Sequence, residues 1–395
     1  MSHLENTKVK VILKPGRTKS IRNRHPWLFS GAIEKVEGEY QPGDIVSVYS
    51  AEGELMAKGF INPHSQIRVR LLTFQEELID DDFFLNRLRR AYQSRNVLFS
   101  NETNTYRVVH ADGDYLPGLI VDKYDRVIVV QIYSVGMEKL KESLIQWIRE
   151  VLQPDTIVER SEASARVNEG LVREKKVLWG ELENPVIVLE NGIKYTVDVW
   201  EGQKTGLFLD QRDNRRRMAT LAAGKKMLNC FSYTGGFSVA AAKKGAETIS
   251  VEISELAQQM AKKNFELNGI NPNQHRFVTA NVFEYLRDTE EEFDIIILDP
   301  PAFVKKKTHM ENGSRAYKDV NRLAIQKIKS GGLILTCSCS SFVHWVLFQQ
   351  IVYSAAKEAG RSVQILSRFG HPVDHPINIF HPEGEYLKSM LLRVY

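Results

Sequence analysis

Residues 293–303 read FDIIILDPPAF, and this stretch decides the fold. The apolar run Ile295–Leu298 is typical of a strand that is buried on both faces of a parallel sheet. It ends in Asp299, followed by Pro300 and Pro301, and a proline pair forms a stiff, extended turn. In open α/β sheets, ligands bind at the carboxyl ends of the strands. We therefore expect a buried strand here, with functional residues directly after it.

Strand-like and helix-like segments alternate on both sides of this stretch. Strands are expected over Lys226–Cys230, Thr248–Val251, Arg276–Thr279, Asp294–Leu298, Leu333–Thr336, Val363–Ser367 and Leu387–Val394. Helices are expected over Gly236–Lys244, Glu255–Asn268, Val282–Leu286, Tyr317–Ile328 and Phe342–Ala359. Ser254 is placed to cap the second of these helices and Gly269 to end it. The alternation predicts an α/β domain with a parallel sheet that helices cover on both faces.

The N-terminal half follows other patterns. Residues 1–73 carry short β-rich runs between turn signals, which predicts a small barrel with strands at Lys8–Leu13, Ile45–Tyr49, Leu55–Phe60 and Ile67–Leu72. Residues 74–183 predict an α+β domain with a helix from Phe83, strands at Tyr106–His110, Leu119–Val121, Val127–Tyr133 and Thr156–Arg160, and a helix at Met137–Leu152. Residues 184–395 form the third predicted domain. It opens with a hairpin over Val186–Leu189 and Lys194–Val199, which turns at Asn191-Gly192.

The composition fits an ordinary soluble globular protein. A chain of 395 residues is long enough for two or three domains, and 43% hydrophobic with 26% charged residues is a typical balance. It contains no apolar run of about 18 residues that would span a membrane, and its N-terminus lacks the pattern of a secretory signal. Its three cysteines do not suggest a disulfide framework. We therefore expect a cytoplasmic protein with reduced thiols.

Basic residues gather in separate places along the chain. A net charge of +4 permits a polyanionic partner but does not demand one. Clusters occur at residues 17–24, 212–217 and 305–307. Each cluster alone fits a solvated surface, but the three together favour a nucleic-acid track.

A loop containing two glycines, NCFSYTGG at residues 229–236, follows the strand Lys226–Cys230. Such a loop lets the backbone approach a nucleotide-like ligand closely. Glu252 ends the next strand, about twenty residues on, where an acid would hydrogen-bond ribose hydroxyls. This spacing fits a nicotinamide nucleotide or S-adenosylmethionine, while an ordinary turn with a surface glutamate is the alternative.

The turn after Asp299 helps to decide between these two candidate cofactors. Its rigid carbonyls and carboxylate can read the amino edge of a planar base, and Phe303 is available for stacking on it. A dehydrogenase has no need of this arrangement. The turn therefore favours S-adenosylmethionine as cofactor and a nucleobase as substrate.

Two of the three cysteines lie in TCSCSS, residues 336–341, at the end of the predicted strand Leu333–Thr336. A cysteine thiolate is a strong nucleophile for covalent catalysis. If the strand continues, Cys337 and Cys339 share a face, so periodicity does not choose between them. Cys339 lies further toward the carboxyl end and nearer the expected cleft. Buried core cysteines are the alternative, and Cys230 fits packing beside the cofactor.

Several of these motifs, in this order, resemble one family. The segments 229–237, 299–303 and 336–341, together with Glu252, resemble the Rossmann-type S-adenosylmethionine-dependent RNA methyltransferases. The resemblance narrows to the bacterial RlmI-like 23S rRNA 5-methylcytosine methyltransferases through QKTG (203–206), FLDQR (208–212), YKD (317–319) and DHP (374–376). RHPWLFSG, residues 24–31, is similar to the start of their PUA domain, a small RNA-binding barrel.

This resemblance implies a Rossmann-like class I methyltransferase domain behind a PUA-like barrel, with S-adenosylmethionine as cofactor and 23S rRNA as partner; it also allows a homodimer. Its implied catalytic residues are Cys339, at the family's Ser-Cys-Ser nucleophile position, and Asp299. The implied cofactor-binding residues are Asp210, Gln211, Asn229, Phe231, Tyr233, Thr234, Gly235, Glu252, Asn281, Val282, Phe283 and Asp299. The implied substrate-binding residues are Pro300, Pro301, Phe303, Arg24 and Lys305, and no metal ligands are expected.

The implied reaction explains the need for a cysteine. Carbon 5 of cytosine is a poor nucleophile until a thiolate adds to carbon 6, which makes carbon 5 able to accept a methyl group. Asp299 would hold the amino edge and ring nitrogen of the base and stabilise the developing charge. The chain departs from the family at Ala302, where a lysine is common, and at Asn281, where an acid is usual. Lys305–Lys307 can supply positive charge instead, and the amide oxygen of Asn281 can still accept from the adenine amino group.

Two other functions stay open at this point. A base-nitrogen methyltransferase acting on guanine shares the Asp-Pro-Pro-aromatic turn, and it would keep its activity in a Cys339→Ala variant. A non-catalytic RNA-binding factor for ribosome assembly would keep the fold but would not bind S-adenosylmethionine.

Overall fold

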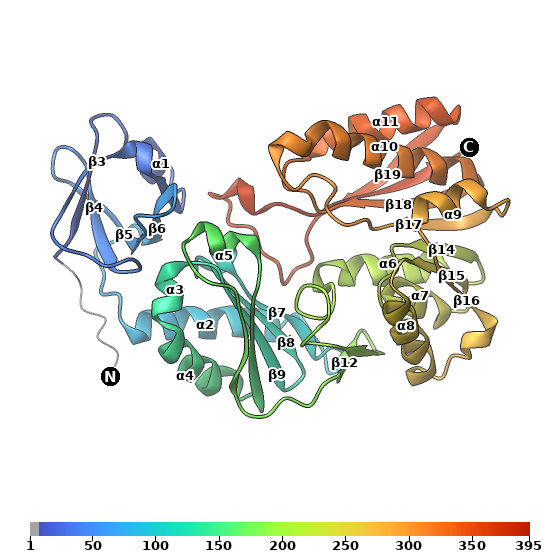
Figure 1. Cartoon of the computed structure of the whole chain (residues 1–395), viewed down its shortest axis with the longest axis horizontal. Coiled ribbons are helices and arrows are strands. Elements are labelled where there is room, and N and C mark those ends of the chain that lie inside the picture. The colour runs from blue at the N-terminus through green and yellow to red at the C-terminus, as the bar shows by residue number, and fades with distance from the viewer. Residues whose placement is uncertain (1–7) are drawn as a thin grey trace. The chain divides into compact units, whose positions relative to one another are not determined.

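The computed structural model describes residues 8–395, and the N-terminal segment considered above for a secretory signal lies outside the described residues (Figure 1). Over the described part, the chain forms a first compact unit from residues 8–186, 197–207 and 373–384, and a second from residues 187–196, 208–372 and 385–395. None of the described helices is both long and apolar enough to cross a membrane.

The first unit begins with a barrel-like sheet ordered β2-β6-β5-β4-β1-β3. Its elements are β1 (Lys10–Leu13), α1 (Lys19–Arg22), β2 (Trp27–Phe29), β3 (Ile33–Glu37), β4 (Ile45–Tyr49), β5 (Leu55–Ile61) and β6 (Ile67–Thr73). The four strands predicted from the sequence are present. The prediction missed β2 and β3, because β2 has only three residues and β3 is an edge strand with three exposed charged residues and only two half-buried apolar ones.

The first unit continues with a second sheet, ordered β11-β10-β9-β8-β7. Its elements are α2 (Asp81–Asn96), β7 (Thr105–His110), β8 (Leu119–Tyr124), β9 (Val127–Ile132), α3 (Val135–Lys139), α4 (Lys141–Leu152), β10 (Thr156–Ser161), α5 (Ser164–Asn168) and β11 (Glu174–Trp179). Apolar residues of α2 and α4 pack with those of the strands in one core. The predicted helix Met137–Leu152 is broken at Leu140, which leaves helical geometry and is buried.

The second unit contains the sheet that the opening stretch predicted. Its strands are β14 (Lys226–Cys230), β15 (Glu247–Glu252), β16 (Arg276–Thr279), β17 (Phe293–Leu298), β18 (Ile328–Ser338), β19 (Val363–Phe369) and β20 (Lys388–Val394). Its helices are α6 (Arg212–Leu221), α7 (Gly236–Ala242), α8 (Glu255–Leu267), α9 (Val282–Asp288), α10 (Met310–Lys327) and α11 (Trp345–Ala359). Ser254 caps α8 as predicted, accepting from the backbone N–H of Ala257.

A hairpin and short 3₁₀ turns complete the described elements. The hairpin joins β12 (Val186–Glu190) to β13 (Ile193–Val197), and its turn residues Asn191 and Gly192 have φ of 50° and 76°, as an Asn-Gly hairpin turn requires. The 3₁₀ turns are η1 (Ser30–Ala32), η2 (Ala111–Asp114), η3 (Leu209–Gln211), η4 (Pro272–Gln274), η5 (Lys307–His309) and η6 (Pro382–Gly384).

The strand order of the second unit is β16-β15-β14-β17-β18-β20-β19. The prediction of a parallel sheet is wrong for β20, which pairs antiparallel with both β18 and β19. The chain reaches β20 through residues 370–387 without a crossover helix, and antiparallel neighbours do not need one. The functional strands β14, β15, β17 and β18 are parallel, so their carboxyl ends meet at one edge.

Helices cover both faces of this sheet, as Figure 1 shows for α10 and α11 on one side and α7 on the other. Leu228 and Ile296 pack into an apolar cluster with α9, α10 and α11. Met227 and Ile295, one position away on the same strands, pack into a cluster with α6 and α7. Alternate residues are thus buried on opposite faces, which explains the uninterrupted apolar run in the opening stretch. The division into three domains at residues 73 and 183 stays a prediction.

Candidate active site

The loop after β14 adopts an unusual backbone conformation. Phe231, Tyr233 and Gly235 have φ of 59°, 47° and 76°, all in the left-handed region that favours glycine. At Gly235 an added Cβ would lie 2.9 Å from the Cβ of Ala261, so only glycine fits there. Non-glycine residues in this region carry strain that the surrounding structure must hold, and such residues concentrate at ligand sites.

Glu252 ends β15 and holds this loop in place. Glu252 is 8% exposed, and its carboxylate accepts hydrogen bonds from the backbone N–H groups of Tyr233 (2.9 Å) and Ser254 (3.1 Å). A carboxylate offers about four lone-pair positions. Capacity therefore remains for the hydroxyls of a ribose beside the loop.

Asn281, Val282 and Phe283 begin α9 at the same sheet edge. The side-chain oxygen of Asn281 accepts from the backbone N–H of Phe283 at 2.9 Å and caps the helix. Val282 is buried, while the ring of Phe283 lies 6.4 Å from that of Phe231 and 6.1 Å from that of Phe303. Asn281 is exposed, and its oxygen is already engaged in capping, which sequence reasoning did not anticipate.

Asp299, directly after β17, is oriented by a chain of amide hydrogen bonds. The side-chain N–H of Gln211 donates to Asp299 Oδ1 at 2.7 Å. The side-chain N–H of Asn214 in turn donates to Gln211 Oε1 at 2.7 Å and to Ser389 Oγ at 3.0 Å. Asp210, beside Gln211, accepts from the hydroxyl of Tyr386 at 2.9 Å. Gln211 was assigned to the cofactor by resemblance, and its contact here is with Asp299.

The two late cysteines differ in their surroundings. Cys337 is fully buried in β18 and its thiol donates to Ser389 Oγ at 3.3 Å. Burial raises the pKa of the Cys337 thiol well above its ordinary value, and the charge of Asp299 raises it further. Cys339 lies just beyond the strand and is partly exposed, with its Sγ 3.9 Å from the carbonyl oxygen of Pro300. The half-exposed thiol therefore lies beside the Asp299 turn. Cys230 is fully buried, and burial raises its pKa.

Ser340 joins the loops after β17 and β18. Its Oγ accepts from the backbone N–H of Val304 at 3.1 Å and shares a hydrogen bond with the Tyr317 hydroxyl at 3.0 Å. The ring of Phe303, in the loop after β17, lies 4.8 Å from that of Tyr317. The ring predicted to stack on a base is thus partly buried among protein aromatics. Pro300 is buried, whereas Pro301 and Lys305 are exposed.

Lys388 is a site residue that sequence reasoning missed. It begins β20, is 2% exposed, and its ammonium donates to the carbonyl oxygens of Ser340 (2.8 Å) and Tyr386 (2.6 Å). Burial lowers the pKa of Lys388 to about 8, while the charges of Cys339 and Glu385 act in the opposite direction. A lysine at the start of the apolar strand LKSMLLRV was the available signal.

The basic residues 212–217 do not form the predicted nucleic-acid track. Arg212 and Arg215 are buried, and Arg215 forms a bidentate ion pair with Glu190 at 2.8 and 2.6 Å. Arg217 lies over the ring of Phe369 at 4.4 Å, and Arg216 is exposed. The helix α6 places Arg212 and Arg215 on its core-facing side, which a charge count does not reveal. Lys305–Lys307 are exposed, and Arg24 lies in the first unit.

The donors and acceptors at the sheet edge fit S-adenosylmethionine. Glu252 suits ribose hydroxyls, and the loop of residues 231–235 suits close approach of the ligand to the backbone. The side-chain oxygen of Asn229 is buried and accepts no hydrogen bond from any described residue, so it can accept one from a ligand ammonium group. Among the described residues no group of histidine, cysteine and acidic side chains is placed to hold a metal ion.

Comparisons with known proteins agree with this reading. A PUA-like domain model matches residues 11–74, and a model described as S-adenosylmethionine-dependent methyltransferase matches residues 164–393. Two similar proteins are named Ribosomal RNA large subunit methyltransferase I. The one from Aeromonas salmonicida is 44% identical to this chain, over 98% of this chain and 99% of the relative. The one from Shewanella frigidimarina is 45% identical, over 98% of this chain and 100% of the relative.

Solved structures share the fold over nearly the whole chain. A candidate S-adenosylmethionine-dependent methyltransferase from Streptococcus mutans has a TM-score of 0.82 at 25% identity, covering 97% of this chain and 99% of that one. A candidate methyltransferase solved in complex with SAH has a TM-score of 0.84 at 24% identity, with the same coverage. The chain is therefore an S-adenosylmethionine-dependent methyltransferase with a PUA-like domain, and it belongs to the family of ribosomal RNA large subunit methyltransferase I.

Proposed function

We propose that the protein methylates carbon 5 of a cytosine in large-subunit (23S) rRNA through a covalent adduct with Cys339. The names of its relatives support ribosomal RNA as the substrate. The observation that carries the cytosine-5 assignment is the partly exposed Cys339 thiol, 3.9 Å from the carbonyl of Pro300 in the Asp299 turn. A nucleophile beside a base-reading turn is what this reaction needs and what methylation of a base nitrogen does not.

Cys339 acts as the nucleophile in this proposal. Its thiolate adds to carbon 6 of the cytosine, and the electron pair of the 5,6 double bond makes carbon 5 nucleophilic. When bound, S-adenosylmethionine supplies the methyl group that carbon 5 takes. Loss of the carbon 5 proton to a base and expulsion of the Cys339 thiolate then restore the ring. Cys337 is unsuited to this role, because its burial raises its pKa and removes it from the surface.

Asp299 holds the base. Its carboxyl group accepts from the exocyclic amino group and, when protonated, donates to the ring nitrogen as charge develops there. Gln211 fixes the orientation of the carboxylate from the side, which supports a positioning role for Gln211. Pro300, Pro301 and Phe303 shape the turn around the base, and the packing of Phe303 on Tyr317 supports a fixed rather than a mobile turn.

In this proposal the loops after β14, β15 and β16 would hold the cofactor. Glu252 takes the ribose hydroxyls, and residues 229–235 surround the amino-acid part. Phe231 and Phe283, whose rings approach edge to face, flank the adenine beside Val282. Asn281 keeps its amide N–H groups for the adenine ring, because its oxygen caps α9. Asp210 is buried and accepts from the Tyr386 hydroxyl, so its assignment to the cofactor rests on the resemblance alone.

The remaining predictions concern partners and location. The PUA-like barrel docks rRNA through phosphate contacts that include Arg24, and Lys305 contacts the substrate near the Asp299 turn. A homodimer and a cytoplasmic location stay predictions as well.

The proposal is tested with labelled S-adenosylmethionine and large-subunit rRNA, followed by mapping of the modified base. Cys339→Ala should lose at least about a thousandfold in rate, since covalent activation is lost outright. Cys337→Ala, the matched control two residues away, should retain activity. RNA containing 5-fluorocytidine at the target should trap a denaturation-resistant complex with wild-type protein, because fluorine cannot leave as a proton does.

The outcomes separate the alternatives. Methylated guanine with full activity in Cys339→Ala would establish a base-nitrogen methyltransferase instead. Binding of RNA without any methyl transfer would favour the ribosome-assembly role.

A further inference from the structure

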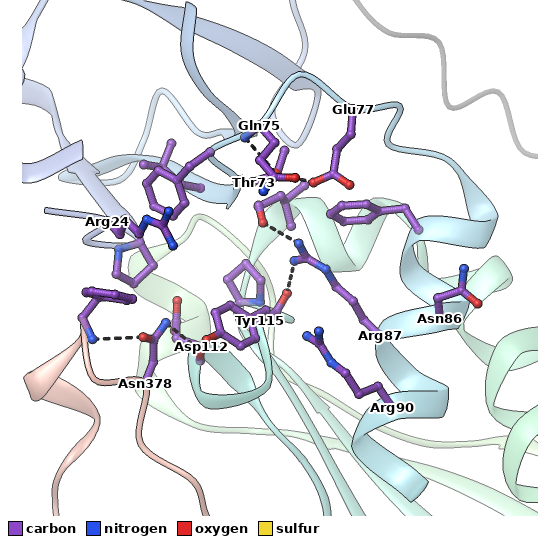
Figure 2. A pocket seen from close by; sticks show the side chains of 17 residues that line it. Arg24, Thr73, Gln75, Glu77, Asn86, Arg87, Arg90, Asp112, Tyr115 and Asn378 are labelled. Carbon is purple, nitrogen blue, oxygen red and sulfur yellow. Dashed lines mark hydrogen bonds between the residues drawn. The ribbon is translucent and has the colours of Figure 1, made fainter. Parts of the chain in front are cut away.

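The first unit contains a cavity of about 620 Å³, and Arg24 is one of the residues that line it (Figure 2). It lies among the end of β6, the exposed side of α2, the turn η2 and the segment around Asn378. Ligand sites typically enclose about 300–1,000 Å³, so the cavity is large enough for a nucleotide. Arginines and aromatic rings line it, together with the carboxamides of Gln75 and Asn86.

Arg87 is the most firmly held cation in this cavity. Its guanidinium donates to the backbone oxygens of Tyr115 (2.5 Å) and Leu72 (2.7 Å) and lies 3.9 Å above the ring of Phe83. Burial lowers the pKa of Arg87 to about 10, which the charge of Glu77 partly offsets. Two neutral carbonyls fix the plane of this group, and they leave its positive charge to be matched by a ligand.

Arg90 and Arg24 add positive charge from two sides, as Figure 2 shows. Arg90, one helical turn after Arg87, lies 5.4 Å from the ring of Tyr115, and Arg24 lies 5.9 Å from the ring of Phe380. Within residues 8–395, no carboxylate forms an ion pair with any of these three arginines. Unmatched guanidiniums around one cavity are suited to an anion such as phosphate.

The acidic residues of the cavity form no ion pair with these arginines, although the charge of Glu77 raises the pKa of Arg87. Glu77 accepts a hydrogen bond from the Thr73 hydroxyl. Asp112 is buried and accepts from the indole N–H of Trp27 at 3.2 Å. Both carboxylates thus already have neutral donors of their own.

The backbone at this cavity is strained in two places. Arg24 and Tyr115 have φ of 56° and 60°, which non-glycine residues seldom adopt. Tyr115 is 43% exposed as a residue, and the guanidiniums of Arg87 and Arg90 lie 6.0 and 5.4 Å from its ring. Strain of this kind is retained where it presents a side chain for function.

A second cavity of about 340 Å³ adjoins the first and shares Arg87, Arg90 and Tyr115 with it. An exposed ring with cations beside it and space on either side matches the usual way of holding single-stranded nucleic acid, in which bases stack on aromatics and phosphates lie on basic groups. Two adjoining cavities suit consecutive linked nucleotides better than one free nucleotide.

We infer that these adjoining cavities bind a single-stranded segment of the substrate RNA, with Tyr115 stacking on a base and Arg87 and Arg90 contacting phosphates. This inference rests on the proposed action on rRNA and adds to it a site outside the methyltransferase unit. Arg24 and Phe380 extend the same surface toward the barrel.

The test uses full-length protein, a labelled short single-stranded oligoribonucleotide and a large-subunit rRNA transcript, with binding measured by fluorescence anisotropy over a range of salt. Arg90→Ala should weaken binding severalfold and make the slope of log affinity against log salt shallower by about 0.7. Arg89→Ala is the matched control, because the neighbouring Arg89 pairs with Glu150 instead; it should change neither quantity.

Tyr115 gives a second readout that charge does not affect. Tyr115→Asn removes the ring but suits the left-handed backbone, and it should weaken binding at least about fivefold. Tyr115→Phe keeps the ring and should bind the RNA with wild-type affinity. RNA carrying 4-thiouridine should crosslink to a peptide that contains Tyr115.

The results distinguish this inference from the proposed function. Unchanged RNA affinity in Arg90→Ala and Tyr115→Asn, with cytosine-5 methylation intact, would overturn the cavity site alone. Loss of affinity in both variants, with methyl groups mapped to guanine, would support the site and overturn the proposed chemistry. S-adenosylmethionine affinity, measured by calorimetry, should be unchanged in all these variants, and a loss would indicate misfolding rather than a binding role.

Discussion

Arg215 on α6 is buried and Arg87 on α2 is half-buried, but the groups that accept their hydrogen bonds differ in charge. Arg215 is 3% exposed, its charge is matched by both oxygens of Glu190, and it also donates to the carbonyl of Phe208. Arg87 is half-buried and donates to carbonyls only. A guanidinium whose charge is matched inside the fold stabilises the fold, whereas one held by neutral groups keeps its charge for a ligand.

The same contrast separates the two late cysteines. Cys337 is buried and bonded to Ser389, while Cys339 lies beyond the strand end and partly exposed. The two arginines, like the two cysteines, are the same residue type. Within each pair, the side chains differ in how deeply they are buried and in which groups they contact. Unfolding and labelling experiments, which depend on burial and on the partner of each group, can therefore test these differences.

The largest effect is expected at Arg215. Arg215→Ala leaves the carboxylate of Glu190 buried without its partner, which typically costs about 3–5 kcal/mol. Urea unfolding of the variant should show this loss, and Arg216→Ala, an exposed neighbour, should unfold like wild type. If Arg215→Ala proved as stable as Arg216→Ala, the assignment of Arg215 to the fold rather than to RNA would be wrong.

A smaller effect is expected when thiols are alkylated. Cys339 should react with iodoacetamide on the order of 100-fold faster than Cys337, because a fully buried thiol reacts only when the structure opens locally. Mass spectrometry of the peptides assigns each label, and Cys339→Ala should remove the fast phase. Equal labelling of Cys337 and Cys339 would remove the basis for choosing between them.

Local signals predicted much of the second unit. Strands β14 and β16 have the predicted bounds, the Ser254 cap forms, and the hairpin turns at Asn191-Gly192. These features depend on side chains within a few residues of one another. The antiparallel direction of β20 was not predictable in this way, because an apolar run reads the same in either direction.

Long-range pairing explains what the sequence did not reveal about the sites. The glycine loop, Glu252, Asp299 and Cys339 could be named as candidates because each lies at or just after the end of a strand, and parallel strands bring their ends together. The role of Arg215 depends on Glu190, on a different element, so a count of basic residues misassigned it. The arginine cavity was missed because its lining comes from segments as distant as Arg24 and Phe380.

Lys388 combines features of Arg215 and Arg87, and the smallest effect is expected from its substitution. It is buried like Arg215 but, like Arg87, donates to carbonyls, and its charge interacts with Cys339. Since a thiolate at Cys339 raises the pKa of Lys388, the ammonium must favour the thiolate by the same interaction. Lys388→Met should therefore slow Cys339 alkylation at a given pH, because the thiolate loses this stabilising charge.

The sign of this effect sets its pH window. Burial lowers the pKa of Lys388 to about 8, so the ammonium is present below that pH and is lost above it. Wild type and Lys388→Met should therefore differ in their Cys339 alkylation rate below about pH 8 and converge as the pH rises past it. Lys357→Met, an exposed lysine on α11, is the control and should follow wild type throughout. A difference that persisted unchanged well above pH 8 would mean that Lys388 acts on Cys339 through packing rather than through its charge.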